Sequence, residues 1–293
     1  MGRCQPGGIL MTRRSLLLPA AASVVGLRGI SLSAQTAAQP VARKGRLRQT
    51  ATRGCFGTGV SMEQCCKIAV QVGLKGLDVQ GGQAADFEML KKYGLVPVLI
   101  AIPDEINRKE VQETAIQHLR TRIDVAAAGG VPIVCMHFGA RTGMTDEEGI
   151  ENSLKVLNQV KAVAEDKAIT LVLQVFNSKV NHPNNQADHT KWVVEIIKRI
   201  NSPRVKLLYD CYHMQIMEGD IIRTIRQNIQ YIAHFHTGGV PGRHELDGTQ
   251  ELQWRSVAEA IVNAGFTGYF AHEFVPTRDP MKSLEEAARL CDV

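Results

Sequence analysis

Eight short runs rich in β-branched and apolar residues alternate with longer segments of helical period, and this alternation strongly constrains the fold. The runs lie at residues 52–57, 76–80, 96–102, 132–139, 169–177, 205–210, 231–238 and 268–274. Between them, apolar residues recur every three or four positions, as in TKWVVEIIKRI at 190–200. Such alternation predicts a parallel sheet with right-handed helical crossovers, and eight units in about 240 residues predict a closed (β/α)8 TIM barrel.

The barrel is expected to be a single α/β domain over residues 46–293. Hydrophobic residues make up 44% of the 293-residue chain, which is enough for one large core. A doubly wound open sheet is the alternative, but it normally has a glycine-rich phosphate-binding turn after its first strand. The segment FGTGV at 56–60 lacks the third glycine of that turn, so the barrel is favoured.

Residues 1–45 are expected to form a leader and linker. The segment MTRRSLLLPAAASVVGLRGISLSAQTAA at 11–38 has an arginine pair, Arg13 and Arg14, before an apolar run that Arg28 interrupts. This pattern is similar to a twin-arginine signal and predicts export to the periplasm; an uncleaved extension on a cytoplasmic protein is the alternative. The run is too short and too interrupted to span a bilayer, so no membrane association is expected once the leader is removed.

Charge and cysteine content exclude several classes of partner and site. The formal net charge is +5, but several of the positive charges lie in the leader, so the remainder is close to neutral. Neither nucleic acid nor a membrane surface is therefore an expected partner. None of the seven cysteines forms a C-x-x-C pair, and Cys135 and Cys211 fall in apolar runs where buried thiols are expected. We also expect the chain to form a homo-oligomer.

Four polar residues lie near the carboxyl ends of the last four predicted strands: Gln174, Asp210, His236 and Glu273. In a TIM barrel these ends converge on one mouth, and charges buried there are costly unless they are paired. Two carboxylates, an imidazole and an amide oxygen suit Mn²⁺ or Mg²⁺, and the histidine also allows Co²⁺ or Zn²⁺. The alternative is that the acids pair with lysine or arginine and that His236 is an ordinary core histidine.

The second half of the chain resembles a known family. The segments DCYHMQIMEGD at 210–220, HFHTGGVPGRHELDGTQEL at 234–252 and HEF at 272–274 resemble the hydroxypyruvate isomerase-like branch of the xylose-isomerase-like barrels, which also contains ketose 3-epimerases. This resemblance covers most of residues 50–293. It implies a TIM barrel and a divalent metal held by Glu, Asp, His and Glu from the last four strands. It also implies that the two glutamates move the substrate proton.

Asp210, His236 and Glu273 match that ligand set, whereas position 174 holds glutamine. A glutamine amide can offer its oxygen to a metal, but it cannot accept and return a proton at neutral pH. The catalytic positions are therefore Gln174 and Glu273, with Glu273 the one base among the ligands. Three consequences stay open: a reduced or different reaction on a related sugar, binding without turnover, or a substitution engineered to trap substrate.

Further residues are expected to serve the substrate. His137, His213, Asn177 and Arg243 are the expected contacts, because imidazoles can donate to substrate oxygens and arginine suits a carboxylate. Glu245, two residues after Arg243, is expected to relay a proton. A solvent-exposed charged loop is the alternative for the last two. Two residues after the fifth strand, Lys179 and His182, are weaker candidates, and the tryptophans Trp192 and Trp254 are expected in the core.

The preferred interpretation is an isomerase of the intramolecular aldose–ketose type, or an epimerase, acting on a small hydroxy-keto acid or ketose through an enediolate. One alternative is a metal-dependent lyase or hydrolase of oxidised sugars, and another is a sugar-binding protein weakened as a catalyst by Gln174. A nuclease of the endonuclease IV type has the same barrel. It needs more metal ligands and a basic groove, and the sequence indicates neither.

Overall fold

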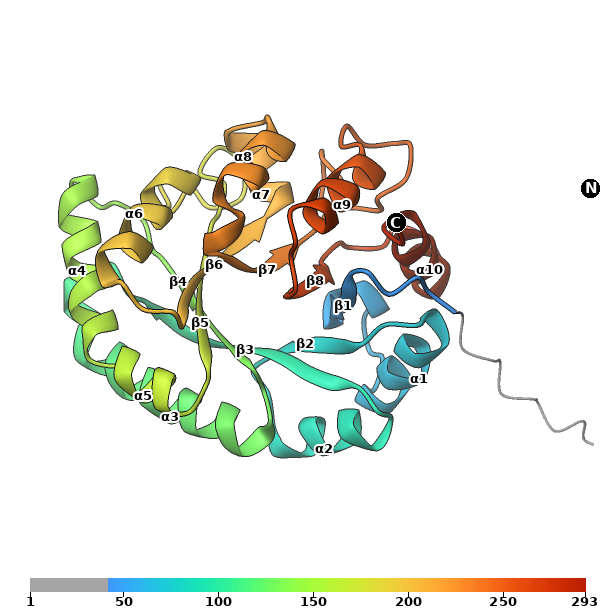
Figure 1. The fold of residues 1–293 in the computed structure, drawn as a ribbon, viewed down its shortest axis with the longest axis horizontal. Coiled ribbons are helices and arrows are strands. Elements are labelled where there is room, and N and C mark those ends of the chain that lie inside the picture. Colours follow the sequence, from blue (N-terminus) through green and yellow to red (C-terminus); the bar gives the residue numbers. More distant parts are fainter. Residues whose placement is uncertain (1–41) are drawn as a thin grey trace, which may run out of the picture. The chain divides into compact units, whose positions relative to one another are not determined.

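The structure, a computed structural model, describes residues 42–293. Its eight parallel strands close into a barrel in chain order, so the predicted TIM barrel is confirmed (Figure 1). The strands are β1 (Arg48–Thr52), β2 (Gly76–Gln80), β3 (Val96–Glu105), β4 (Ile133–His137), β5 (Thr170–Gln174), β6 (Val205–Asp210), β7 (Ile232–His236) and β8 (Tyr269–His272). The twin-arginine leader predicted from the sequence lies outside the described residues.

The helices lie outside the strands, as the crossovers of a parallel barrel require (Figure 1). They are α1 (Met62–Val72), α2 (Ala84–Lys92), α3 (Gln112–Gly129), α4 (Asp146–Asn158), α5 (Lys161–Asp166), α6 (Thr190–Ile200), α7 (Cys211–Met217), α8 (Ile221–Asn228), α9 (Trp254–Asn263) and α10 (Pro280–Leu290). Short 3-10 helices lie at Arg53–Phe56, Lys109–Val111 and Ile229–Tyr231. Among residues 42–293, the helices are all too short or too polar to cross a membrane.

Local sequence explains where α4 begins and how α6 and α9 contribute to the core. Helix α4 starts at a capping box, in which the Thr145 hydroxyl accepts from the backbone N–H of Glu148 and the Glu148 carboxylate accepts from that of Thr145. Helix α6 places one apolar face against the barrel, including the buried Trp192. Trp254, the first residue of α9, is also buried, so both tryptophans are core residues as predicted.

The first strand differs from its predicted position. The sequence predicts a strand at 52–57, whereas β1 spans Arg48–Thr52 and the chain then turns into the 3-10 helix at Arg53–Phe56. Strand β1 pairs with β8 from Arg48↔Tyr269 to Ala51↔His272. Because its partner is more than 200 residues away in the chain, the position of this strand is set by barrel closure rather than by local pattern.

A tight approach between β2 and β3 gives a stability prediction. Gly76 pairs with Val96, and a Cβ atom added at Gly76 would overlap the backbone oxygen of Val96. Since that backbone is fixed by strand pairing, we expect Gly76→Ala to reduce the free energy of unfolding by about 1–3 kcal/mol in urea denaturation. Gly248→Ala is the control, because no atom lies within 4 Å of its added Cβ. Equal losses in the two variants would contradict the packing argument.

Candidate active site

The polar residues predicted from the strand ends do converge at the carboxyl-terminal mouth of the barrel. Gln174, Asp210 and His236 are the last residues of β5, β6 and β7, and Glu273 directly follows β8. His137 ends β4 beside them. Asp210 and His236 are a register pair on adjacent strands, so their side chains enter the same layer of the mouth.

Asp210 serves two structural purposes at once. Its Oδ1 accepts from the backbone N–H of His213 and caps α7, while Oδ2 faces the other polar residues of the mouth. An N-cap side chain accepts from the backbone N–H three residues later, which accounts for the spacing between Asp210 and His213. The cap therefore holds the first turn of α7 close to the end of β6. Both side chains are fully buried.

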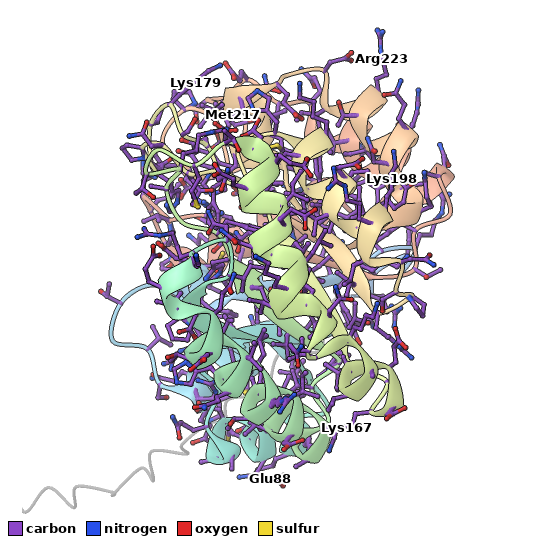
Figure 2. All side chains as sticks on the ribbon, turned by 90° about the vertical axis from the view of Figure 1, so that its left-hand side faces the viewer. Glu88, Lys167, Lys179, Lys198, Met217 and Arg223 are labelled. Carbon is purple, nitrogen blue, oxygen red and sulfur yellow. The ribbon has the colours of Figure 1, made fainter. Side chains whose placement is uncertain are left out.

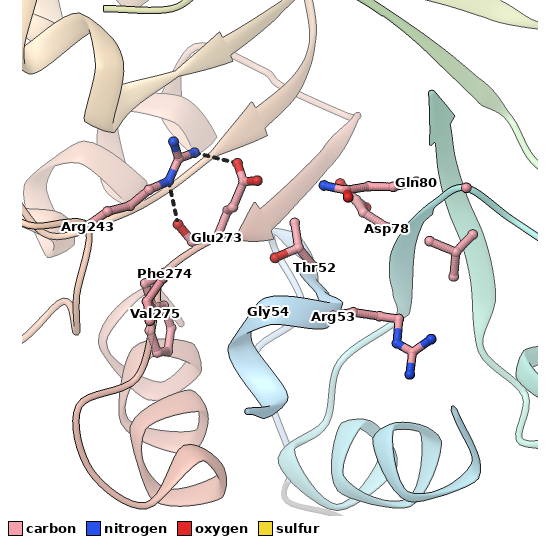
Figure 3. Close-up of a pocket in the computed structure, with 11 residues that line it drawn as sticks. Thr52, Arg53, Gly54, Asp78, Gln80, Arg243, Glu273, Phe274 and Val275 are labelled. Atoms are coloured by element: carbon pink, nitrogen blue, oxygen red, sulfur yellow. Dashed lines mark hydrogen bonds and ion pairs between the residues drawn. The ribbon is translucent and has the colours of Figure 1, made fainter. Parts of the chain in front are cut away.

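Arg243, from the loop after β7, joins the two carboxylates. Its Nη2 donates to Asp210 Oδ2 at 2.6 Å. The same nitrogen donates to Glu273 Oε2 at 2.5 Å, and Nε donates to the Glu273 backbone oxygen (Figure 3). Its Nη1 lies 2.8 Å from His213 Nε2, and the guanidinium lies over the Tyr212 ring. The structure therefore places Arg243 inside the predicted cluster, whereas its sequence position left open a solvent-exposed loop.

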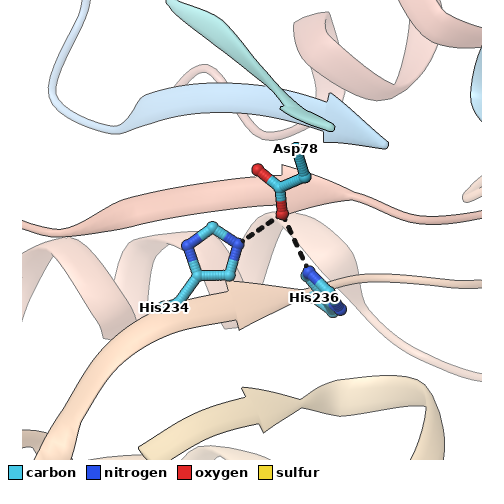
Figure 4. A group of neighbouring side chains, drawn as sticks. All are labelled: Asp78, His234 and His236. Atoms are coloured by element: carbon cyan, nitrogen blue, oxygen red, sulfur yellow. Dashed lines mark hydrogen bonds and ion pairs between the residues drawn. The ribbon is translucent and has the colours of Figure 1, made fainter. Parts of the chain in front are cut away.

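His236 is held from two sides. Its Nδ1 lies 2.6 Å from Glu273 Oε2 and 3.8 Å from Asp210 Oδ2. Its Nε2 lies 3.0 Å from Asp78 Oδ2, and His234 Nε2 lies 2.8 Å from the same oxygen (Figure 4). Asp78 comes from the middle of β2, and the sequence analysis missed both it and His234. A single acid within the apolar run GLDVQ, and a second histidine two residues before His236, were the available signals.

Gln174 reaches the cluster through its nitrogen. Its Nε2 lies 3.5 Å from Asp210 Oδ2, and its Oε1 faces the buried Cys135 thiol at 3.6 Å. The predicted role as an oxygen ligand would require a half-turn of this amide. His137 Nε2 lies 3.7 Å from the same thiol, which places His137 beside Gln174.

The loop after β5 contributes one wall of the mouth. Asn177 Nδ2 lies 2.7 Å from His213 Nδ1, and the His182 ring contacts both Phe176 and His213. Lys179 instead extends to the protein surface, where its Nζ donates to the backbone oxygens of Ile216 and Met217 (Figure 2). Asn177, His182 and His213 thus lie at the site, and Lys179 does not.

Glu245 is not brought to the cluster, contrary to the proton relay predicted for it. Its buried carboxylate accepts from the Thr277 backbone N–H at 2.8 Å, from the Thr277 hydroxyl and from the Ser283 hydroxyl. These bonds join the loop after β7 to the start of α10. The side chain leaves the mouth because its hydrogen-bond donors come from a segment 32 to 38 residues further along the chain.

Three adjoining cavities of about 410, 390 and 330 Å³ open around the cluster. Arg243 and Glu273 line the first two, and Gln174 and His137 line the last two. Figure 3 shows Thr52, Asp78 and Gln80 across the opening from Glu273. A small polar molecule in this space would contact the carboxylates, the imidazoles and the guanidinium together.

Residues 63–292 match the family model of the xylose isomerase-like TIM barrel. The chain belongs to this family. Its relatives include a Xenopus laevis protein provisionally named hydroxypyruvate isomerase, which is 23% identical over 77% of this chain and 90% of that protein. The D-psicose 3-epimerase of Ruminiclostridium cellulolyticum is 30% identical over a shorter segment, 40% of this chain and 39% of that one.

Solved structures of other proteins share this fold. A family 2 AP endonuclease from Brucella melitensis superposes with a TM-score of 0.76 at 22% identity, over 81% of this chain and 96% of that one. At this level of identity the likeness concerns the fold.

The buried charges of this xylose isomerase-like site shift each other's pKa values. Burial favours neutral Glu273, but His236 and Arg243 outweigh it and hold the pKa of Glu273 well below its usual range. Burial also opposes charge on His236, yet the Glu273 and Asp78 carboxylates raise the pKa of His236 to about 10. Burial lowers the pKa of His213 to about 4 and also lowers that of His137. At neutral pH Glu273 is therefore ionised, and His213 and His137 are neutral.

The donor set fits a divalent cation. Asp78, Asp210 and Glu273 supply three carboxylates, and within residues 42–293 Arg243 is the only arginine or lysine paired with them. His236 Nδ1 is buried and makes no aligned hydrogen bond despite its contact with Glu273. A cation held by this nitrogen, Asp210 and Glu273 would replace a proton on Nδ1 and offset the excess negative charge.

Proposed function

We propose that this protein is a divalent-metal-dependent isomerase that converts a small hydroxy-keto acid or ketose through an enediolate. The named relatives are isomerases and epimerases of small keto compounds, and this chain is an enzyme of that kind. The observation that supports the metal-dependent mechanism most directly is the convergence of Asp210, His236 and Glu273, with one ligand atom of each within 4.8 Å of the others. The adjoining cavities are of a size that suits a small substrate.

The divalent ion, when bound, supplies a Lewis acid that stabilises negative charge developing on two adjacent substrate oxygens. Glu273 is the proposed base that removes the proton from substrate carbon and returns it to the neighbouring carbon. Its Oε2 contacts His236 and Arg243, whereas its Oε1 makes no ion pair with any of residues 42–293. The Glu273 side chain is 21% exposed, so this free oxygen can reach a molecule in the cavity.

Arg243 and His213 are the proposed groups for orienting the substrate. Arg243 Nη2 contacts both carboxylates that would hold the ion, so ion binding has to release part of the guanidinium. The released N–H groups can then donate to a substrate carboxylate or hydroxyl. The neutral His213 ring lies between Asn177 Nδ2 and Arg243 Nη1 and accepts from one of these two donors, because its other ring nitrogen carries a proton. His137 presents a second neutral imidazole beside Gln174.

Solvent-proton exchange tests this function. Protein from about residue 40 onward, loaded with Mn²⁺ or Mg²⁺, would be given hydroxypyruvate and a panel of ketoses in heavy water. We expect deuterium in the substrate and its isomer, with loss of the label when the ion is removed by chelation, because the proposed enediolate requires the ion. Mass spectrometry measures the incorporation.

The control is the same panel with the metal-free protein and with free metal. Incorporation that persists without any divalent ion would contradict the metal-dependent mechanism. Ligand binding without incorporation for any member of the panel would favour the sugar-binding interpretation instead. The export predicted from the twin-arginine leader would place the reaction in the periplasm, and it stays a prediction.

A further inference from the structure

Asp78 lies deep in the barrel and contacts the cluster from the opposite wall. It comes from β2, and both histidines that it contacts come from β7, 156 and 158 residues further along the chain. Strands β2 and β7 are not neighbours in the barrel, so these contacts cross its interior. The Asp78 and His234 side chains are fully buried, and that of His236 is 4% exposed.

One oxygen of Asp78 makes both contacts. His234 Nε2 lies 2.8 Å and His236 Nε2 lies 3.0 Å from Asp78 Oδ2, while Oδ1 has no hydrogen-bond partner among the described residues (Figure 4). An ionised carboxylate can only accept hydrogen bonds. Both imidazoles therefore donate from Nε2, and on His236 this leaves Nδ1 as the nitrogen that faces Asp210 and Glu273.

We propose that Asp78 is a positioning residue that fixes the ring orientation and tautomer of His236, and that His234 holds Asp78 in place by a second hydrogen bond. This inference rests on the proposed function, because an unprotonated Nδ1 on His236 matters only if that nitrogen binds an ion. Without Asp78, the His236 ring could turn and present either nitrogen to the cluster. A carboxylate behind a ligating imidazole also makes that imidazole a stronger donor to the metal.

The same three residues are close enough to hold an ion by themselves, with one ligand atom of each within 4.8 Å of the others. Hydrogen bonding is favoured because the two imidazole nitrogens meet a single carboxylate oxygen at ordinary hydrogen-bond distances. The two arrangements differ in the number of ions bound per chain.

Metal titration distinguishes a hydrogen-bonded Asp78 from a second metal site at the same three residues. We expect the wild-type protein to bind one Mn²⁺ per chain by calorimetry, and Asp78→Asn to bind it about 10- to 100-fold more weakly. Asp188→Asn is the matched control: Asp188 is also a buried carboxylate, paired with Arg141 and Ser178 away from the cluster. It should lose stability but keep the wild-type affinity for Mn²⁺. His234→Gln, which keeps a donor for Asp78, should also retain one tightly bound ion.

A second measurement needs no variant. In ¹⁵N-histidine NMR spectra of the Mg²⁺-loaded protein, we expect His236 to carry its proton on Nε2 and none on Nδ1. The opposite tautomer would overturn the proposal, even if Asp78→Asn failed to fold.

The remaining outcomes are distinguishable. Wild-type affinity for Mn²⁺ in Asp78→Asn would overturn the positioning role and leave the metal-dependent function intact. Two ions per chain, with one lost in His234→Gln, would show that the three residues are themselves a metal site. No ion bound by the wild-type protein would reject the proposed function, and this inference with it.

Discussion

Replacing Glu273 with glutamine is expected to slow solvent-proton exchange by about 10²- to 10⁴-fold while the barrel stays folded. The Glu273 carboxylate faces the cavity and contacts His236, and a glutamine amide cannot accept a proton at neutral pH. Loss of its charge also leaves Arg243 paired with Asp210 alone. The rate of deuterium incorporation into substrate, measured at saturating Mn²⁺, gives the effect.

Glu218→Gln is the control for this variant. Glu218 is a carboxylate that accepts from the Thr190 N–H and hydroxyl, and it does not line the cavities around the cluster. It should leave the exchange rate unchanged. If Glu273→Gln bound Mn²⁺ normally and still exchanged at the wild-type rate, another group would have to be the base, and the neutral His137 beside Gln174 would be the first to test.

Gln174→Glu is expected to raise the exchange rate by about 10²-fold or more, the usual scale for a positioned acid or base. The amide nitrogen lies 3.5 Å from Asp210 Oδ2, so a carboxylate at this position would join the same cluster. It would add a fourth negative charge among Asp78, Asp210 and Glu273. Affinity for Mn²⁺ should therefore rise as well, while the metal-free protein should become less stable because like charges repel.

Gln174→Met separates the two effects, because it removes the amide without adding a charge or a base. Exchange kinetics and calorimetry on both variants measure rate and affinity independently. A Gln174→Glu variant that binds Mn²⁺ more tightly but exchanges at the wild-type rate would show that position 174 affects the ion only. Such a result would reject the hypothesis that a base was lost there.

The barrel was predictable because its strands are buried on both faces. Runs such as VPVLIAI at 96–102 are almost continuously apolar. Strand β6 has the predicted bounds of 205–210. In a TIM barrel the carboxyl ends of all strands meet at one mouth. Gln174, Asp210, His236 and Glu273 could therefore be placed there without any knowledge of contacts. Each of these predictions depends only on residues within one repeating unit.

Other features required the closed structure. The position of β1 depends on its pairing with β8, and the carboxylate of Glu245 turns to donors near α10. The sequence left open whether Arg243 faces solvent, and the fold places its guanidinium between two carboxylates. In each case the deciding partner lies about 30 or more residues away in the chain.

The sequence by itself therefore determined the barrel, the mouth at which its polar residues meet and the absence of a carboxylate at position 174. Only the tertiary structure decided which atoms face each other there. Closing the barrel brings Asp78 from β2 against His234 and His236 on β7, across the barrel interior. Because a buried carboxylate must find its donors wherever the fold provides them, the acid in GLDVQ and the histidine before His236 do not by themselves show that they pair.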